Sequence, residues 1–127
     1  MKNEIESVLE FYNAFEQPVG TDIEDLSLSR ACLRSRLLKE EVAELHSALV
    51  LRDVVEAADG IVDCIYILLG TAIEIGIAHK LPELFAEVHR SNMTKLGANQ
   101  KPIFRADGKI SKGPFFTEPN LHKILHP

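Results

Sequence analysis

The sequence predicts an all-α protein, a bundle of about four helices followed by an irregular tail. Before Gly97, apolar residues recur every three or four positions through long stretches, which is the helical period. After Gly97, turn-forming pairs replace that period, and Asp107-Gly108 between Phe104 and Ile110 predicts a small β-hairpin. We therefore expect a helical core over residues 1–97. Residues 98–127 are expected to form a tail that packs on the core or on a neighbouring subunit.

Composition narrows the class of protein. The chain has 127 residues, enough for one domain with a real core. Acidic residues outnumber basic ones by 19 to 14, and the net charge of −5 argues against general nucleic-acid binding. The most apolar stretch, Val62 to Ala72, is too short to span a bilayer. We expect a cytoplasmic protein that binds neither nucleic acid nor membrane, with Cys32 and Cys64 reduced in its core.

Four helices account for the apolar periodicity. Ser27 is expected to cap the second, Gly76 to end the third, and Pro82 to lie in the first turn of the fourth. The predicted ranges are Asn3 to about Glu16, about Leu28 to Val50, about Val54 to Ile75, and about Leu81 to Leu96.

The third of these helices is apolar nearly all round beyond Asp63. Such a helix must be covered on several sides, which about four helices in one chain do not achieve. We therefore predict a homo-oligomer, a dimer or a tetramer, that packs through this helix. Gly60 and Gly70 lie inside it and would permit close approach of another helix or of a ligand.

Acidic residues form a stripe on each of the two central helices, because they recur at intervals of three or four. Asp53 is expected to cap the third helix, with Glu56 closing a pair like a capping box. That places the turn near Leu51 and Arg52, so antiparallel helices bring together positions whose numbers sum to roughly 103. The second helix contributes Glu40, Glu41 and Glu44, and the third contributes Asp59 and Asp63.

In this arrangement Glu44 meets Asp59, and Glu40 and Glu41 meet Asp63. Carboxylates this close repel each other unless a cation lies among them. Oxygen donors favour Mg²⁺ or Mn²⁺ over zinc. The alternative is that both stripes are solvated outer faces.

Three arginines precede the acidic stripes. Arg30, Arg34 and Arg36 are best explained as surface charges. Arg34 has an alternative role, which is to reach toward an anionic ligand near the metal.

A Glu-Glu-x-x-Glu helix followed by a second acidic helix resembles the all-α nucleoside triphosphate pyrophosphohydrolases of the MazG type, whose relatives include phosphoribosyl-ATP pyrophosphohydrolases. The resemblance covers nearly the whole chain and is most specific in the Val-His-Arg-Ser-Asn-Met segment with the tail after it. The matching segments are Asp59–Gly70, Glu87–Gly97 and Lys101–Pro114.

This resemblance implies a dimeric or tetrameric helical bundle. It also implies Mg²⁺-dependent hydrolysis of a nucleoside triphosphate to the monophosphate and pyrophosphate, with house-cleaning of the nucleotide pool as a possible role. The family's metal-ligand pattern is Glu-x-x-Glu followed by Glu-x-x-Asp. Glu41 and Glu44 match its first half. Glu56-x-x-Asp59 fits the letters of the second half, but alignment on Tyr66 and Gly70 makes Asp63 the final ligand and puts Gly60 where the family has Glu. Asp59, one residue earlier, would then replace that Glu. Asp59 and Asp63, which the facing pairs also favour, are taken as the second half, and Glu56, which has a capping role, is kept in reserve.

The remaining predicted site residues follow from the chemistry of a polyphosphate. Glu40 would position or deprotonate the attacking water. Lys95 would balance phosphate charge, Asn92 would hydrogen-bond phosphate or sugar, and Lys101 is a weaker candidate for substrate binding.

Two other functions remain open. Phosphoribosyl-ATP hydrolysis uses the same ligand logic, so the acidic motif does not separate it from general nucleotide hydrolysis. A non-catalytic helical interaction module would bind no metal, or only a structural one. A di-iron bundle is disfavoured because no Glu has His three residues later.

Overall fold

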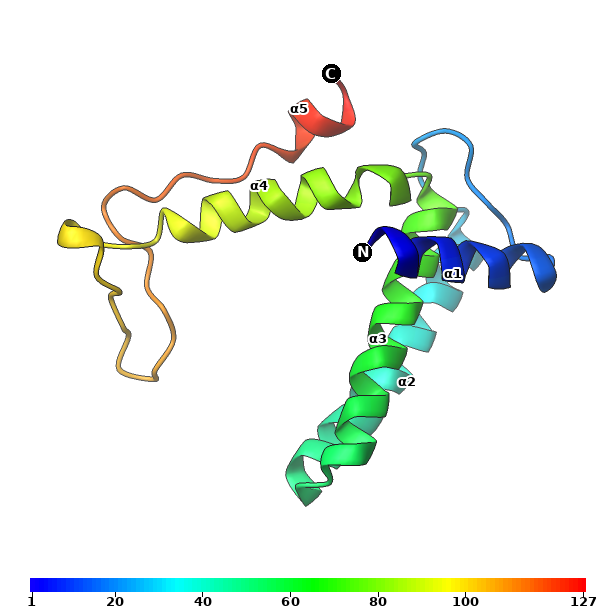
Figure 1. The fold of residues 1–127 in the computed structure, drawn as a ribbon, viewed down its shortest axis with the longest axis horizontal. Coiled ribbons are helices and arrows are strands. Elements are labelled where there is room, and N and C mark those ends of the chain that lie inside the picture. The colour runs from blue at the N-terminus through cyan, green and yellow to red at the C-terminus, as the bar shows by residue number, and fades with distance from the viewer. The chain divides into compact units, whose positions relative to one another are not determined.

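The structure is a computed structural model that describes residues 1–127 and contains helices but no strand (Figure 1). The predicted all-α class is therefore confirmed. Four helices are long, and a fifth short one lies in the tail that was predicted to be irregular. The helices are α1 (Lys2–Ala14), α2 (Leu28–Leu51), α3 (Val54–Ile75), α4 (Leu81–Met93) and α5 (Leu121–Leu125), with 3-10 turns at Ala78–Lys80 and Ala98–Gln100.

The chain forms two compact units, residues 1–79 and residues 80–127. In the first unit α2 and α3 run side by side in opposite directions, and α1 crosses the pair (Figure 1). In the second unit the tail runs back along α4. Tail residues 98–127 share the second unit with α4, and a division of the catalytic core from the tail at residue 97 stays a prediction.

The turn between α2 and α3 forms where the sequence placed it. Arg52 adopts a left-handed conformation with φ of 57°, and the Asp53 carboxylate accepts the Val55 and Glu56 amides, each at 3.1 Å. The predicted pairing of Asp53 with Glu56 as a capping box is wrong. The Asp53 amide donates instead to the Ala48 carbonyl at 3.0 Å, which leaves nothing for the Glu56 carboxylate to accept.

The register of α2 against α3 matches the predicted facing of positions that sum to roughly 103. Arg30 binds Glu74, the Arg34 guanidinium donates to the Ile67 carbonyl, and Gly60 lies against Leu45. A Cβ on Gly60 would come within 3.0 Å of the Leu45 Cβ, so this glycine sets how closely the helices approach. The same register brings Glu41 opposite Asp63.

The prediction that both cysteines lie in the core is wrong for Cys32, which is exposed, while Cys64 is half-buried. Cys32 lies off the face of α2 that meets α3, a face that carries Arg34, Glu41 and Ala48. The fourth helix also ends earlier than predicted, at Met93. There the Thr94 hydroxyl donates to the Ser91 carbonyl at 2.6 Å and accepts the Thr117 amide at 2.9 Å.

One face of α3 is apolar and uncovered. Four of its large side chains have exposed fractions between 46% and 59%, although the helix is otherwise the most buried of the fold. This exposure agrees with the reasoning that predicted a homo-oligomer, and the oligomer itself stays a prediction. The four residues are Ile61, Val62, Ile65 and Leu68.

In the second unit, polar side chains of α4 hold the tail. The Arg90 guanidinium binds the Glu87 carboxylate at 2.8 Å and donates to the Thr117 hydroxyl at 2.9 Å. The Ser91 hydroxyl donates to the Thr117 carbonyl at 2.8 Å, and the Glu87 carboxylate accepts the Asn120 amide at 2.8 Å. Part of the Val-His-Arg-Ser-Asn-Met segment therefore has a structural role, which is to fix the tail on α4.

The predicted hairpin in the tail is reduced to a single antiparallel bridge between Phe104 and Ile110. Gly108 turns the chain with φ of 84°. None of the helices is by itself both long enough and apolar enough to cross a membrane.

Candidate active site

The acidic residues predicted as metal ligands gather along the middle of the α2–α3 pair. Glu41 on α2 and Asp63 on α3 occupy the faces that meet and are half-buried. The other three carboxylates, on Glu40, Glu44 and Asp59, flank them and are exposed. None of the five makes a hydrogen bond or an ion pair within the protein.

The electrostatics of Glu41 show that the five carboxylates are neighbours. Partial burial raises the pKa of the Glu41 carboxyl above its ordinary 4.5, and the negative charges of Asp63, Glu44, Glu40 and Asp59 raise it further. Glu56 lies seven residues before Asp63, which is about 10 Å along α3, so it is farther from the facing pair of Glu41 and Asp63 than Asp59 is. The stripe is thus a region of unbalanced negative charge.

A cation fits this donor set, because it consists only of oxygens, carries excess negative charge and has no protein cation to neutralise it. As the side chains lie, no group of three or more His, Cys, Asp or Glu residues is close enough to hold a metal ion. Glu40, Glu44 and Asp59 are exposed, and exposed side chains change rotamer within nanoseconds. Glu41, Glu44, Asp59 and Asp63 remain predicted ligands.

A second cluster of charged side chains lies farther along the same helix pair, and it is buried and paired. The Glu74 side chain is 1% exposed. Arg30 binds its carboxylate through two nitrogens, at 3.0 and 2.7 Å, and the Tyr12 hydroxyl donates to it at 2.9 Å. Burial and the Glu74 contact raise the pKa of Tyr12 to about 12, so this hydroxyl stays protonated.

Arg34 belongs to the same buried cluster, so its preferred interpretation as a surface charge is wrong. It is 8% exposed. Its Nε donates to the Thr71 hydroxyl at 3.0 Å and its Nη2 donates to the Ile67 carbonyl at 2.7 Å. The helix pair buries it because α3 supplies oxygen acceptors at the positions that face it.

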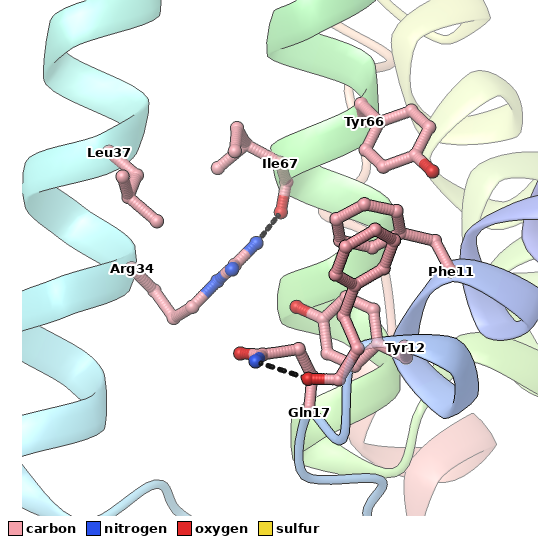
Figure 2. A pocket seen from close by; sticks show the side chains of 8 residues that line it. Phe11, Tyr12, Gln17, Arg34, Leu37, Tyr66 and Ile67 are labelled. Carbon is pink, nitrogen blue, oxygen red and sulfur yellow. Dashed lines mark hydrogen bonds between the residues drawn. The ribbon is translucent and has the colours of Figure 1, made fainter.

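Between this buried cluster and the acidic stripe lies a pocket of about 370 Å³, enclosed by α1, α2 and α3 (Figure 2). One wall is aromatic and comes mainly from α1, and the opposite wall carries Arg34 and Leu37 from α2. The lining residues are Phe11, Tyr12, Phe15, Gln17, Arg34, Leu37, Tyr66 and Ile67.

Comparison with known families identifies this architecture. The sequence model of the family described as phosphoribosyl-ATP pyrophosphohydrolase matches residues 8–92, which is more than half of the chain and includes both acidic helices. The chain belongs to this family. The family is part of the MazG-like all-α nucleoside triphosphate pyrophosphohydrolase superfamily, so the predicted resemblance is confirmed. No curated protein matches the chain in a sequence search.

Membership in the pyrophosphohydrolase family makes the protein an enzyme, a hydrolase that acts on an acid anhydride of a nucleotide. The acidic helices α2 and α3 lie inside the matched range, and so does most of α4. The tail from residue 98 onward lies outside it.

The predicted substrate-binding residues of this pyrophosphohydrolase lie in the second unit. Asn92 and Lys101 are exposed and Lys95 is half-buried. None of their side chains makes a hydrogen bond or an ion pair, in contrast to Arg90 and Lys112, which are engaged with Glu87 and Glu118. The three side chains are thus free to contact a ligand, and their roles stay predictions.

Sequence reasoning missed the buried cluster and the aromatic pocket. The signal for the cluster was Glu74, a lone acid among the apolar residues of α3, because a buried carboxylate needs a partner. The facing rule pairs Glu74 with Arg30, which would have predicted the contact. The pocket gave no such signal, because Phe11, Phe15 and Tyr66 fit a helical packing stripe equally well.

Proposed function

We propose that this pyrophosphohydrolase converts a nucleoside triphosphate to the nucleoside monophosphate and pyrophosphate in the cytoplasm. The observation that supports it most is the set of unpaired carboxylates around Glu41 and Asp63. A polyphosphate chain is an anion and would be repelled by these groups, so substrate and acidic stripe are compatible only through a bound cation. An enzyme of this kind would clear unwanted nucleotides from the cellular pool.

The reaction requires water to attack a phosphorus next to the α–β anhydride oxygen. A new bond forms between the water oxygen and that phosphorus, the anhydride P–O bond breaks, and pyrophosphate and the monophosphate separate. The water proton must leave as the bond forms. Glu40, which is exposed beside Glu41 and has no partner, would accept that proton or orient the water.

Glu41, Glu44, Asp59 and Asp63 would hold Mg²⁺, with Mn²⁺ as a substitute. When bound, the ion neutralises phosphate oxygens and lowers the pKa of a coordinated water. The raised pKa of Glu41 supports this proposal, because its partial burial and the neighbouring negative charges both disfavour the ionised carboxylate when no cation is near.

The substrate's phosphates need positive or hydrogen-bonding groups besides the metal. Lys95 would offset phosphate charge, Asn92 would hydrogen-bond phosphate or sugar, and Lys101 would add a second positive charge. Their lack of partners within the protein supports these roles. A surface lysine that serves no ligand is equally free, so their removal must be tested by its effect on KM.

The protein would work as a homodimer or homotetramer that covers the apolar face of α3. Ile61, Val62, Ile65 and Leu68 expose about half of each side chain, and contiguous exposed apolar surface marks an interaction site. Light scattering on purified protein should give twice or four times the chain mass of 14.2 kDa. A monomer at micromolar concentration would contradict this assembly.

Phosphoribosyl-ATP is the second candidate substrate, and the description of the matched family favours it. It contains the same anhydride, so the acidic stripe would serve both reactions. An assay that supplies phosphoribosyl-ATP beside the nucleoside triphosphates separates them by kcat/KM.

The proposed function is tested by a screen of ordinary and damaged nucleoside triphosphates with Mg²⁺, in which pyrophosphate and phosphate are quantified separately. We expect pyrophosphate and monophosphate in equal amounts, dependent on the metal. Release of single phosphates would contradict the assigned bond. Absence of metal-dependent pyrophosphate release from every substrate would favour a non-catalytic interaction module.

A further inference from the structure

The pocket between α1, α2 and α3 has the wall composition of a site for a flat aromatic ligand. The Phe11 and Phe15 rings stack with centroids 4.3 Å apart, and the Tyr66 ring meets Phe11 edge-on at 5.6 Å. Phe15 nevertheless keeps 63% of its surface exposed, so the stack has an open face. The volume of about 370 Å³ falls within the range of small-molecule pockets.

The opposite wall carries a positive charge that the protein compensates only in part. Glu74 holds Arg30 through two short hydrogen bonds. The Oε1 atom of Glu74 lies 3.7 Å from the Arg34 Nη1, which is too long for a hydrogen bond. Two guanidinium groups thus share one carboxylate, and Arg34 is the less tightly paired of the two.

The Arg34 Nη1 also has hydrogen-bonding capacity that no protein group uses. Its Nε and Nη2 are engaged by Thr71 and Ile67, but Nη1 donates to nothing. No enclosed side-chain nitrogen or oxygen in the protein lacks a partner, so Nη1 must open to space, and Arg34 lines the pocket. Thr71 and Ile67 hold the guanidinium in place, and its Nη1 group keeps unused N–H donors in a residue that lines the pocket.

Gln17 supplies an acceptor beside this donor. Its amide nitrogen donates to the Phe15 carbonyl at 3.0 Å, which leaves the amide oxygen without a partner. In Figure 2 that oxygen is turned toward the side of the pocket where Arg34 lies. The pocket therefore offers aromatic faces, a charged donor and a neutral acceptor.

The position of the pocket relates it to the acidic stripe. Leu37 lies one helical turn from Glu41 on α2, and Tyr66 lies one turn from Asp63 on α3, so the two sites are offset by about 5 Å along the helices. A ligand whose phosphates reach the carboxylates would place its other end here.

We propose that this pocket is a nucleobase subsite in which Arg34, positioned by Thr71 and Ile67, selects bases that present a carbonyl oxygen. The proposal rests on the proposed function for its phosphate end. Arg34 has only donors, so an exocyclic carbonyl is attracted and an exocyclic amino group in the same place is opposed donor to donor. Phe11 and Phe15 supply stacking, which favours any base.

The unmodified protein contains its own reporter of this binding. It has no Trp and only two Tyr, and both Tyr12 and Tyr66 line the pocket. Titration with nucleoside 5′-monophosphates in the presence of Mg²⁺ should change the tyrosine fluorescence saturably, after correction for absorbance. Ribose 5-phosphate, which lacks a base, should not change it.

Selectivity is measured with two pairs of nucleotides whose bases carry either a carbonyl or an amino group at one position, with the matching change of protonation at the adjacent ring nitrogen. Deoxyinosine and deoxyadenosine monophosphates differ at the 6-carbonyl against the 6-amino group, and deoxyuridine and deoxycytidine monophosphates differ likewise at position 4. We expect the carbonyl member of each pair to bind about tenfold more tightly, the effect of one charge-assisted hydrogen bond. Equal affinities, or tighter binding of the amino member, would overturn the selection by Arg34.

Variants locate the binding. Phe15→Ala should weaken binding of all bases about tenfold by removing a stacking face. Leu51→Ala is the control for loss of an exposed apolar side chain, since Leu51 is 78% exposed and ends α2, 14 residues from the pocket residue Leu37 on the same helix. Arg34→Lys, which keeps the charge but loses the planar fork, should abolish the preference between inosine and adenosine.

Phe15 is largely exposed, so Phe15→Ala is expected to fold even if Arg34→Lys fails to fold. Calorimetry gives an independent measure of nucleotide binding. If it detects binding that leaves the tyrosine fluorescence unchanged and is as tight in Phe15→Ala, the base binds elsewhere and the subsite is overturned. Triphosphate hydrolysis that is indifferent to the base and to Phe15→Ala would overturn the subsite and leave the proposed function standing. Selective base binding without hydrolysis of any triphosphate would support the subsite and overturn the proposed function.

Discussion

Two regions of the α2–α3 pair differ in how their charged side chains are balanced. Toward the carboxyl end of α3, Glu74 is buried and accepts hydrogen bonds from Arg30 and Tyr12. Near the middle of the pair, Glu41 and Asp63 face each other on the same two helices, and neither pairs with a basic side chain. One carboxylate is satisfied by the protein, and the others are satisfied by nothing in the chain.

The difference separates structural charge from functional charge. A buried carboxylate that lacks a partner is costly, so Glu74 is retained with its arginines because they complete one another. The carboxylates around Glu41 raise its pKa, which means that the fold works against their ionisation. Groups that weaken a fold in this way mark candidate functional sites.

The largest effect is expected from Glu41→Gln or Asp63→Asn. Each substitution removes one predicted metal ligand. Loss of a residue that only supports a ligand costs up to about a hundredfold in activity, so loss of the ligand itself should lower turnover by more than that. The helical circular dichroism should stay unchanged. Glu10→Gln, an exposed acid on α1, is the control for charge removal. Loss of the helical signal in Glu41→Gln would make this carboxylate structural and erase the contrast with Glu74.

Glu74→Ala should have the opposite profile, with a large loss of stability. It strands Arg30 and Arg34 in the interior, and breaking such a buried group costs about 3–5 kcal/mol. Denaturant unfolding measures it. Glu118→Ala breaks the exposed pair with Lys112 and should cost less than about 1 kcal/mol. Similar values for the two variants would mean that burial does not distinguish them.

Gly70→Ala tests how tightly the paired end is built. A Cβ there would come within 2.8 Å of the Arg34 Nη2 and closer still to the Tyr12 hydroxyl. Overpacking of this kind costs about 1–3 kcal/mol. Helix propensity alone predicts the reverse, a gain of about 1 kcal/mol. The sign of the change in unfolding free energy therefore decides whether contact or propensity dominates at this position.

The smallest effect concerns pH. The folded protein raises the pKa of Glu41 above 4.5, so it binds this proton more tightly than the unfolded chain does. The destabilisation from Glu41 is then present at pH 7 and is relieved as the pH falls toward the folded pKa. In metal-free protein, Glu41→Gln should melt higher than the wild type at pH 7, and the gap should narrow by pH 5. A gap independent of pH would contradict the raised pKa.

The sequence predicted most of the fold because its signals are local. Helical spacing, the Asp53 cap and Gly76 placed α3 at Val54–Ile75 as observed, and the turn at Arg52 fixed its register against α2. That register was enough to bring Glu41 opposite Asp63. Two of the predictions that failed, those for Cys32 and Arg34, concern burial, which depends on partners distant in the chain. Arg34 is buried only because Ile67 and Thr71 accept its hydrogen bonds.

Of the candidate site, the acidic half was predicted and the aromatic half was not. Glu41 and Glu44 stood out because two acidic stripes come into register across one turn, whereas a single stripe is ordinarily a solvated face. Phenylalanines at the same spacing are ordinary core residues, and only the structure shows that Phe15 stays exposed beside a pocket.

The central claim is that the unpaired carboxylates of α2 and α3 bind a divalent cation. Isothermal titration of metal-free protein with Mg²⁺ and with Mn²⁺ tests it most directly, in the wild type and in Glu44→Ala. We predict saturable binding to the wild type that disappears in the variant. Binding that persists unchanged in Glu44→Ala, or no binding to the wild type, would contradict the account.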